Sequence, residues 1–227
     1  FLIFFYFIAA YSEGLFFLLT VCAFYFLRRK KLFLAVLFAG LSGATRLVGL
    51  AVVFALLIEV GLTQGFNRKN WFLILSFLGF IAYCWFLFNK QGDPFYFLVA
   101  ETHWQRTIAI PVLGLWETLT NLVKPGFIAT HFNSFLDLLF TILGLGLTIR
   151  TFRFLLPSYA FYSLFSLLLP LFTPSLSSMP RFLLVIFPLF ILIAQFKNQY
   201  VIFAYQTISL MLLSILTVLF INGYWVS

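Results

Sequence analysis

The stretch GLSGATRLVG, residues 40–49, interrupts an apolar run that extends over residues 32–61. The run is longer than the roughly 20 residues that one membrane-spanning helix needs. The stretch that interrupts it holds glycines, hydroxyl residues and an arginine. Two short helices that meet near Arg46 therefore fit the run better than one long helix. A charged side chain at membrane depth is costly unless it is paired or hydrated, so Arg46 also needs a partner.

The composition of the chain is that of an integral membrane protein. Its 227 residues are 63% hydrophobic and 9% charged, with a mean hydropathy of +1.10, whereas a soluble domain is about 45–50% apolar. The formal net charge is +8, but the basic residues cluster in short runs between apolar segments, as cytoplasmic loops do under the positive-inside rule. The sequence therefore predicts membrane lipids as partners and no nucleic acid.

Apolar segments alternate with short polar loops along the chain, which predicts an all-α, polytopic bundle with about eight spans. The expected spans are residues 13–27, two short helices within 32–61, and residues 71–88, 132–149, 154–172, 182–196 and 200–221. The expected cytoplasmic basic residues are Arg28, Arg29, Lys30, Lys31, Arg68, Lys69, Arg150, Arg153 and Lys197. Residues 89–130 are expected to form an outer-face loop with interfacial helices. No repeat or linker divides residues 1–227, so we expect one transmembrane domain.

Four polar motifs fall on the outer side of this map: AYSEG (10–14), ATRLVG (44–49), GDP with HWQR (92–94 and 103–106) and SSMPRF (177–182). Their ionisable residues are functional candidates because such groups are rare in spans. Arg46 and Arg181 offer planar guanidinium groups that match phosphate oxygens. Glu13 and Asp93 could bind sugar hydroxyls, orient an acceptor, hold a divalent cation or neutralise the arginines. For each residue the alternative is a structural ion pair.

The segment that begins at Phe95 passes from apolar to polar residues and contains His103 and Trp104. An interfacial helix with Trp104 as its anchor is the favoured interpretation, and stacking of Trp104 on a sugar ring is the alternative. His103 and His131 lack the spacing of a zinc site, and the sequence contains no HExxH, GxSxG, P-loop or GxGxxG pattern. The sequence therefore predicts no metal site and no cofactor. Glu59 and Asp137 are expected in interhelical hydrogen bonds or at membrane boundaries.

Five motifs occur in one order: YSEGLFFLL (11–19), SGATRLVGL (42–50), GDPFYFLVAETHW (92–104), MPRFLLVIFPLF (179–190) and LFINGYWVS (219–227). Together they resemble the PIG-V-type mannosyltransferases, which act in glycosylphosphatidylinositol assembly and have bacterial relatives. The resemblance implies a GT-C fold. It also implies an inverting enzyme that moves a sugar, usually mannose, from a polyprenyl-phosphate donor to a lipid or glycan acceptor at the outer or luminal face.

The resemblance also implies a catalytic carboxylate in a Trp-Asp type motif of the first outer loop. No such motif precedes YSEG. We therefore expect the chain to be the C-terminal part of a longer enzyme whose catalytic base lies upstream of Phe1, and we assign that role to neither Glu13 nor Asp93. The bacterial plasma membrane is the favoured location, with the endoplasmic reticulum as the alternative in a eukaryote.

Two other functions fit the same sequence. One is a GT-C enzyme for another sugar, such as a pentose or glucose. The other is a flippase or transporter of lipid-linked sugars, which would carry inverted repeats with broken helices near the membrane midplane.

Overall fold

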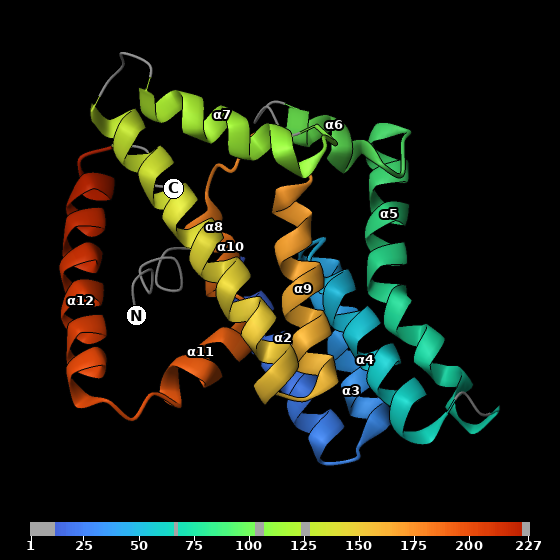
Figure 1. Cartoon of the computed structure of the whole chain (residues 1–227). Coiled ribbons are helices and arrows are strands. Elements are labelled where there is room, and N and C mark those ends of the chain that lie inside the picture. The colour runs from blue at the N-terminus through green and yellow to red at the C-terminus, as the bar shows by residue number, and fades with distance from the viewer. Residues whose placement is uncertain (1–11, 66–67, 103–106, 124–127, 224–227) are drawn as a thin grey trace.

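The computed structural model describes residues 12–65, 68–102, 107–123 and 128–223. Every regular element in these ranges is a helix (Figure 1). In chain order the helices are α2 (Glu13–Arg28), α3 (Leu32–Thr45), α4 (Gly49–Gln64), the 3-10 helix η1 (Arg68–Phe77), α5 (Leu78–Gln91), α6 (Tyr96–Thr102), α7 (Pro111–Val123), α8 (Ile128–Phe154), α9 (Pro157–Leu171), α10 (Met179–Leu184), α11 (Phe187–Ala194) and α12 (Gln199–Ile221). The all-α class predicted from the sequence is confirmed.

Three helices in the described part of the chain are long and apolar enough to cross a membrane: Asn70–Gln91, His131–Phe154 and Gln199–Ile221. Three further apolar helices, α3, α4 and α9, have only 14, 16 and 15 residues. At 1.5 Å per residue they measure about 21–24 Å, which is shorter than the hydrocarbon core of about 30 Å. The three long helices are compatible with a membrane protein.

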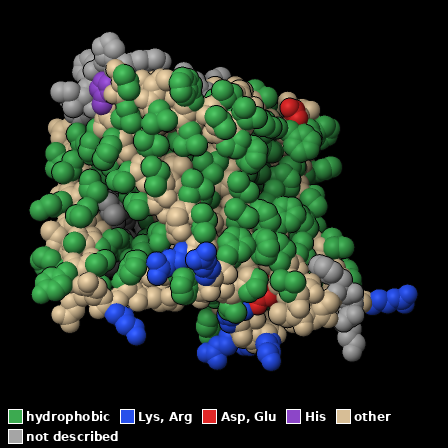
Figure 2. Space-filling view, viewed as in Figure 1, with side chains coloured by type: hydrophobic (Ala, Val, Ile, Leu, Met, Phe, Trp, Pro, Cys, Tyr) green, Lys and Arg blue, Asp and Glu red, His purple; other side chains and the backbone are tan. Residues whose placement is uncertain are grey.

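The turns that carry the basic runs lie together at one end of the bundle, which we name the basic end. The α2–α3 turn, the α8–α9 turn and the α11–α12 connection all reach this end (Figure 1). Figure 2 shows Lys and Arg side chains gathered along the same edge of the molecule. This clustering is the arrangement that the positive-inside pattern predicts.

Helices α6 and α7 lie across the opposite end of the bundle, and we name this pair the cap (Figure 1). The backbone amide of Ala109 donates to the carbonyl of Phe172 over 2.8 Å, which joins the cap to the α9–α10 connection. A Cβ atom on Gly114 of α7 would lie 2.7 Å from the carbonyl oxygen of Thr173. The helices expected in the outer loop are therefore present, and one of them packs directly on the chain that leads to Arg181.

The α3–α4 turn is as the sequence predicts. α3 ends at Thr45, and Arg46 follows with extended backbone angles of φ −151° and ψ 148°. A Cβ atom on Gly49 would lie 2.4 Å from the carbonyl oxygen of Ser42, so the chain can return this closely only without a side chain there. Gly79 of α5 has the same role against α3, because its Cβ would lie 1.7 Å from the carbonyl oxygen of Gly40. These contacts bring α3, α4 and α5 together backbone to backbone.

Residues 182–196 lie in two helices, so the prediction of one continuous helix there is wrong. α10 ends at Leu184 and α11 begins at Phe187. Pro188 lies in the first turn of α11 and has no backbone N–H to continue the hydrogen bonds of a preceding helix. At the break, the carbonyl of Val185 accepts from the amide of Phe187 at 3.0 Å and from the hydroxyl of Tyr162 at 2.8 Å. The break is thus stabilised from α9, which the local sequence does not reveal.

The core lies mainly between α2, α3, α4 and α9, where Phe16, Val52, Ala55 and Tyr162 are fully buried. Helix α12 stands apart from this core (Figure 1) and meets α8 at Leu136 and Leu216. Its remaining apolar side chains are largely exposed, as suits a helix surrounded by lipid.

Replacing Gly49 by Ala should destabilise the bundle by about 1–3 kcal/mol, because the new methyl group collides with the backbone of α3. Gly146→Ala on α8 is the matched control, since nothing lies within 4 Å of a Cβ atom at that position. The measurement is thermal unfolding of the detergent-solubilised protein. Equal melting temperatures for the two variants would show that the α3–α4 turn is not as close as described.

The sidedness of the bundle can be tested by cysteine labelling in a background with Cys22 and Cys84 replaced by Ala. We expect Ile108→Cys, at an 83% exposed position just before α7, to react with a membrane-impermeant maleimide on intact cells. Lys30→Cys at the basic end should react only after permeabilisation, because basic runs stay in the cytoplasm. The reverse pattern would invert the orientation.

Candidate functional site

A buried carboxylate at the start of α2 is the centre of the site. Glu13 is the first residue of α2 and its side chain has no exposed surface. The helix runs from Glu13 to the basic end at Arg28, so its first turn lies at the far end, toward the cap. Burial of a carboxylate costs several kcal/mol unless cations and hydrogen bonds compensate it. The position of Glu13 therefore requires positive partners nearby.

Two arginines supply this compensation. Nη1 of Arg46, at the α3–α4 turn, lies 2.7 Å from Oε1 of Glu13. Arg181, on α10, donates to the same oxygen from Nη2 at 2.5 Å and from Nε at 3.1 Å. Arg46 also donates from Nη1 to the hydroxyl of Ser12 over 3.4 Å. We name Glu13, Arg46 and Arg181 the ion cluster.

The ion cluster carries a formal charge of +1, because one carboxylate faces two guanidinium groups. The side chains of Arg46 and Arg181 remain 18% and 19% exposed, whereas Glu13 is completely covered. Both arginines bind one carboxylate oxygen, and Oε2 of Glu13 is buried without a hydrogen-bond partner in the described part of the chain. A pair of guanidinium groups with excess positive charge and partial access is suited to an anion such as a phosphate.

Backbone geometry directs Arg181 toward Glu13. Ser178, just before α10, has a positive φ of 67°, which is uncommon for a residue with a side chain. The next amide, that of Met179, donates to Oδ1 of Asp137 on α8 over 3.0 Å. Backbone strain of this kind persists only where surrounding contacts hold it, and it is concentrated at functional sites. The hydroxyl of Ser178 is buried without a hydrogen-bond partner among the described residues.

The structure brings together three of the four charged candidates. Asp93 lies in the α5–α6 turn, where Oδ1 accepts a hydrogen bond from the amide of Phe95 at 2.8 Å. No ion pair joins Asp93 to the ion cluster in the ranges that the structure describes. The observed contact stabilises the start of the short helix α6. His103 and Trp104 lie outside the described residues.

Arg28 and Glu59 form a second ion pair at the basic end. Their contact is bidentate, and Nη2 of Arg28 also donates to the hydroxyl of Ser158 at 2.6 Å. The guanidinium group lies 4.9 Å from the ring centre of Tyr159. This pair links α2, α4 and α9. The interhelical role expected for Glu59 is confirmed, as is that for Asp137, whereas Arg28 is more than the loop residue that the sequence indicated.

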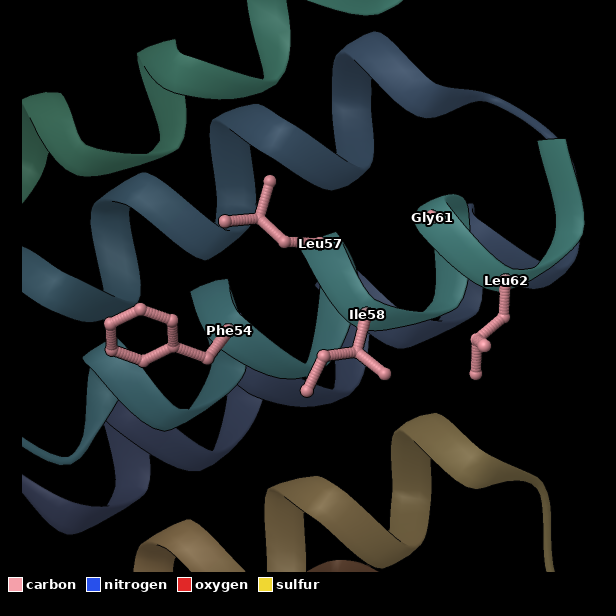
Figure 3. Close-up of a pocket in the computed structure, with 5 residues that line it drawn as sticks. All are labelled: Phe54, Leu57, Ile58, Gly61 and Leu62. Atoms are coloured by element: carbon pink, nitrogen blue, oxygen red, sulfur yellow. The ribbon is translucent and has the colours of Figure 1, made fainter. Parts of the chain in front are cut away.

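An open groove on α4 has a different character from the ion cluster. Phe54, Leu57, Ile58, Gly61 and Leu62 line it, and Figure 3 shows all of them on this one helix. The lining contains no polar side chain, so it is suited to lipid tails and offers nothing to a sugar or a phosphate. The ion cluster therefore remains the candidate site. In the described part of the chain, no group of His, Cys, Asp and Glu residues is arranged to hold a metal ion.

Sequence reasoning missed Tyr162 and the contact between Asp137 and Met179. Neither residue type nor spacing marks them, because each acts on a backbone group far away in the chain.

Comparison with known proteins does not add a family: no family model, curated protein or solved structure matches the chain. The case for function therefore rests on the ion cluster and its surroundings.

Replacing Glu13 by Ala should lower the free energy of unfolding by about 3–5 kcal/mol, because two neighbouring arginines lose their shared counter-charge. Asp93→Asn is the control, since the amide keeps the oxygen that accepts from Phe95; we expect a change below about 0.5 kcal/mol. Chemical or thermal denaturation in detergent measures both. A Glu13→Ala protein as stable as Asp93→Asn would mean that the ion cluster contributes little to the fold.

Proposed function

We propose that this chain belongs to a membrane-embedded glycosyltransferase of the GT-C type. In this proposal it moves a hexose, mannose first, from a polyprenyl-phosphate donor to a lipid or glycan acceptor at the outer or luminal face. The single observation that carries the proposal is the ion cluster, in which two partly exposed arginines share one buried carboxylate. The five ordered motifs that resemble PIG-V-type mannosyltransferases name the sugar and the donor.

The chemistry of the donor explains why two arginines would be needed. As the bond between the sugar and the phosphate oxygen breaks, negative charge develops on the leaving polyprenyl phosphate. Fixed positive charge beside that oxygen lowers the barrier. Arg181 is the first choice for this contact and Arg46 the second. Glu13 keeps both arginines in place and lowers the net positive charge of the cluster. A lower charge binds the polyprenyl phosphate less tightly, so the product can dissociate after transfer.

The surroundings of the ion cluster support the same proposal. The cluster lies away from the basic end, and the cap covers the adjoining end of the bundle (Figure 1). In this proposal an acceptor approaches the ion cluster from the aqueous side while a lipid donor enters from the bilayer. We propose that about eight segments traverse the membrane, in a bacterial plasma membrane or an endoplasmic reticulum. The catalytic base is assigned to no residue of this chain.

One observation favours a second candidate, a flippase or transporter of lipid-linked sugars. The α10–α11 break lies inside the bundle and directly follows the helix that carries Arg181. Broken helices that bind substrate are common in transporters. Such a protein would move the lipid-linked sugar across the bilayer and leave the sugar–phosphate bond intact. The proposed transferase breaks that bond, so the product distinguishes the two.

The test is sugar transfer from radiolabelled polyprenyl-phosphate mannose by the full-length protein in proteoliposomes. Arg181→Lys keeps one positive charge but loses the planar two-point contact, so we expect transfer to fall tenfold or more, which corresponds to about 1.4 kcal/mol. Arg153→Lys, at an exposed position of the basic end, is the matched control and should retain full activity.

Full transfer by both Arg181→Lys and Arg181→Ala would remove Arg181 from the site. Movement of the intact lipid-linked sugar across the bilayer, with no transfer of mannose by the wild-type protein, would favour the flippase. An Arg181 variant that loses activity but unfolds at the wild-type temperature would separate a role in the reaction from a role in stability.

A further inference from the structure

The short helix α10 is attached at both ends to other helices. At its start, the amide of Met179 donates to Oδ1 of Asp137 on α8 over 3.0 Å. Just past its end, the carbonyl of Val185 accepts from the hydroxyl of Tyr162 on α9 at 2.8 Å. α10 has six residues, too few to hold a stable helix without tertiary contacts. Arg181 lies between the two attachments.

We propose that Tyr162 and Asp137 are positioning residues that hold α10 so that Arg181 meets Glu13. They act on the backbone at the two ends of α10, Asp137 on the amide of Met179 and Tyr162 on the carbonyl of Val185. Their importance to donor binding rests on the proposed function. Their control of the contact between Arg181 and Glu13 is a property of the fold, and it can be measured without any activity.

Tyr162 is suited to this task because its ring is immobilised. The side chain is fully buried, and its ring centre lies 5.3 Å from that of Phe24 on α2 and 5.7 Å from that of Phe187 on α11. Its hydroxyl donates to the carbonyl of Val185 in the break. The carbonyl of Val185 also accepts from the amide of Phe187 at 3.0 Å. Without the hydroxyl it would keep only this local contact, and the segment would lose its hydrogen bond to α9.

Asp137 is suited to the other end of α10. It is 6% exposed and lies within α8, the longest described helix, with 27 residues. A carboxylate that accepts from a backbone amide makes a stronger contact than a neutral acceptor. This contact also accompanies the positive φ of Ser178, a conformation that needs support from its surroundings. The two attachments together fix the backbone position of Arg181 and therefore the starting point of its side chain.

The experiment measures the coupling between Glu13 and Arg181 with a double-mutant cycle of Glu13→Gln and Arg181→Gln, read as melting temperatures of the full-length protein in detergent. The cycle is repeated in a Tyr162→Phe background and in a Tyr159→Phe background. Tyr159 belongs to the same aromatic group, with a ring centre 5.4 Å from that of Phe24, and its ring faces Arg28. It is the matched loss of a hydroxyl away from α10.

We expect Tyr162→Phe to reduce the coupling by about half or more and Tyr159→Phe to leave it unchanged. Coupling that is the same in the Tyr162→Phe and wild-type backgrounds, or that is absent from the wild-type protein, would overturn the proposal. If Tyr162→Phe yields no folded protein, the same cycle in two Asp137 backgrounds tests the proposal. Asp137→Asn keeps an acceptor for Met179 and should preserve the coupling, Asp137→Ala should reduce it, and equal coupling in both would overturn the proposal.

A transfer assay on the same variants separates this inference from the proposed function. Reduced coupling in Tyr162→Phe together with no transfer by the wild-type protein would leave the positioning role intact and remove the transferase. Normal transfer by the wild-type protein with unchanged coupling in Tyr162→Phe would support the transferase and remove the positioning role.

Discussion

The buried carboxylate of Glu13 imposes the central constraint on this fold. A charge without exposed surface must be compensated, and here the compensation comes from Arg46 and Arg181, on segments far apart in the chain. The start of α2, the α3–α4 turn and α10 must therefore meet at one point. The arginines need Glu13 as well, because two guanidinium groups so close together repel each other when no anion lies between them. The ion cluster thus connects three distant segments of the chain and also offers positive charge to an anion.

Close contact between backbones makes this meeting possible. Gly49 lets the chain reverse against Ser42, and Gly79 lets α5 cross α3 at Gly40, so three helices share a space that larger side chains would fill. Without water to drive association, helices in a membrane depend on such close packing and on polar contacts. The result is a dense group of short helices next to longer ones, with the ion cluster at their junction. The Arg28–Glu59 pair secures the other end of α2.

Positive charges are solvated differently at the basic end and at the ion cluster, and this difference bears on function. At the basic end, several Lys and Arg side chains project from the surface (Figure 2), where solvent stabilises them. At the ion cluster, positive charge is held within the protein by a carboxylate and stays partly accessible. Charge that is already desolvated and oriented binds a phosphate with little reorganisation, which is the electrostatic condition that a transferase or a flippase of phosphate-linked sugars would need.

Local features determined much of this protein from the sequence alone. The lengths of the apolar runs predicted the helices, the glycines around Arg46 predicted the break between α3 and α4, and the basic runs predicted a common end. Each of these depends on residues close together in the chain. The sequence also marked Glu13, Arg46 and Arg181 as candidates, because isolated charges in apolar segments need partners.

Only the tertiary structure decided which candidates meet. Glu13 and Arg181 are separated by 168 positions, and no local pattern distinguishes that pairing from one with Asp93, which bonds within its own turn. The division of residues 182–196 likewise depends on a hydroxyl from α9, so the hydropathy that indicated one span could not reveal it. Hydropathy and spacing report the environment that a residue requires, whereas its partner is chosen by how distant helices pack.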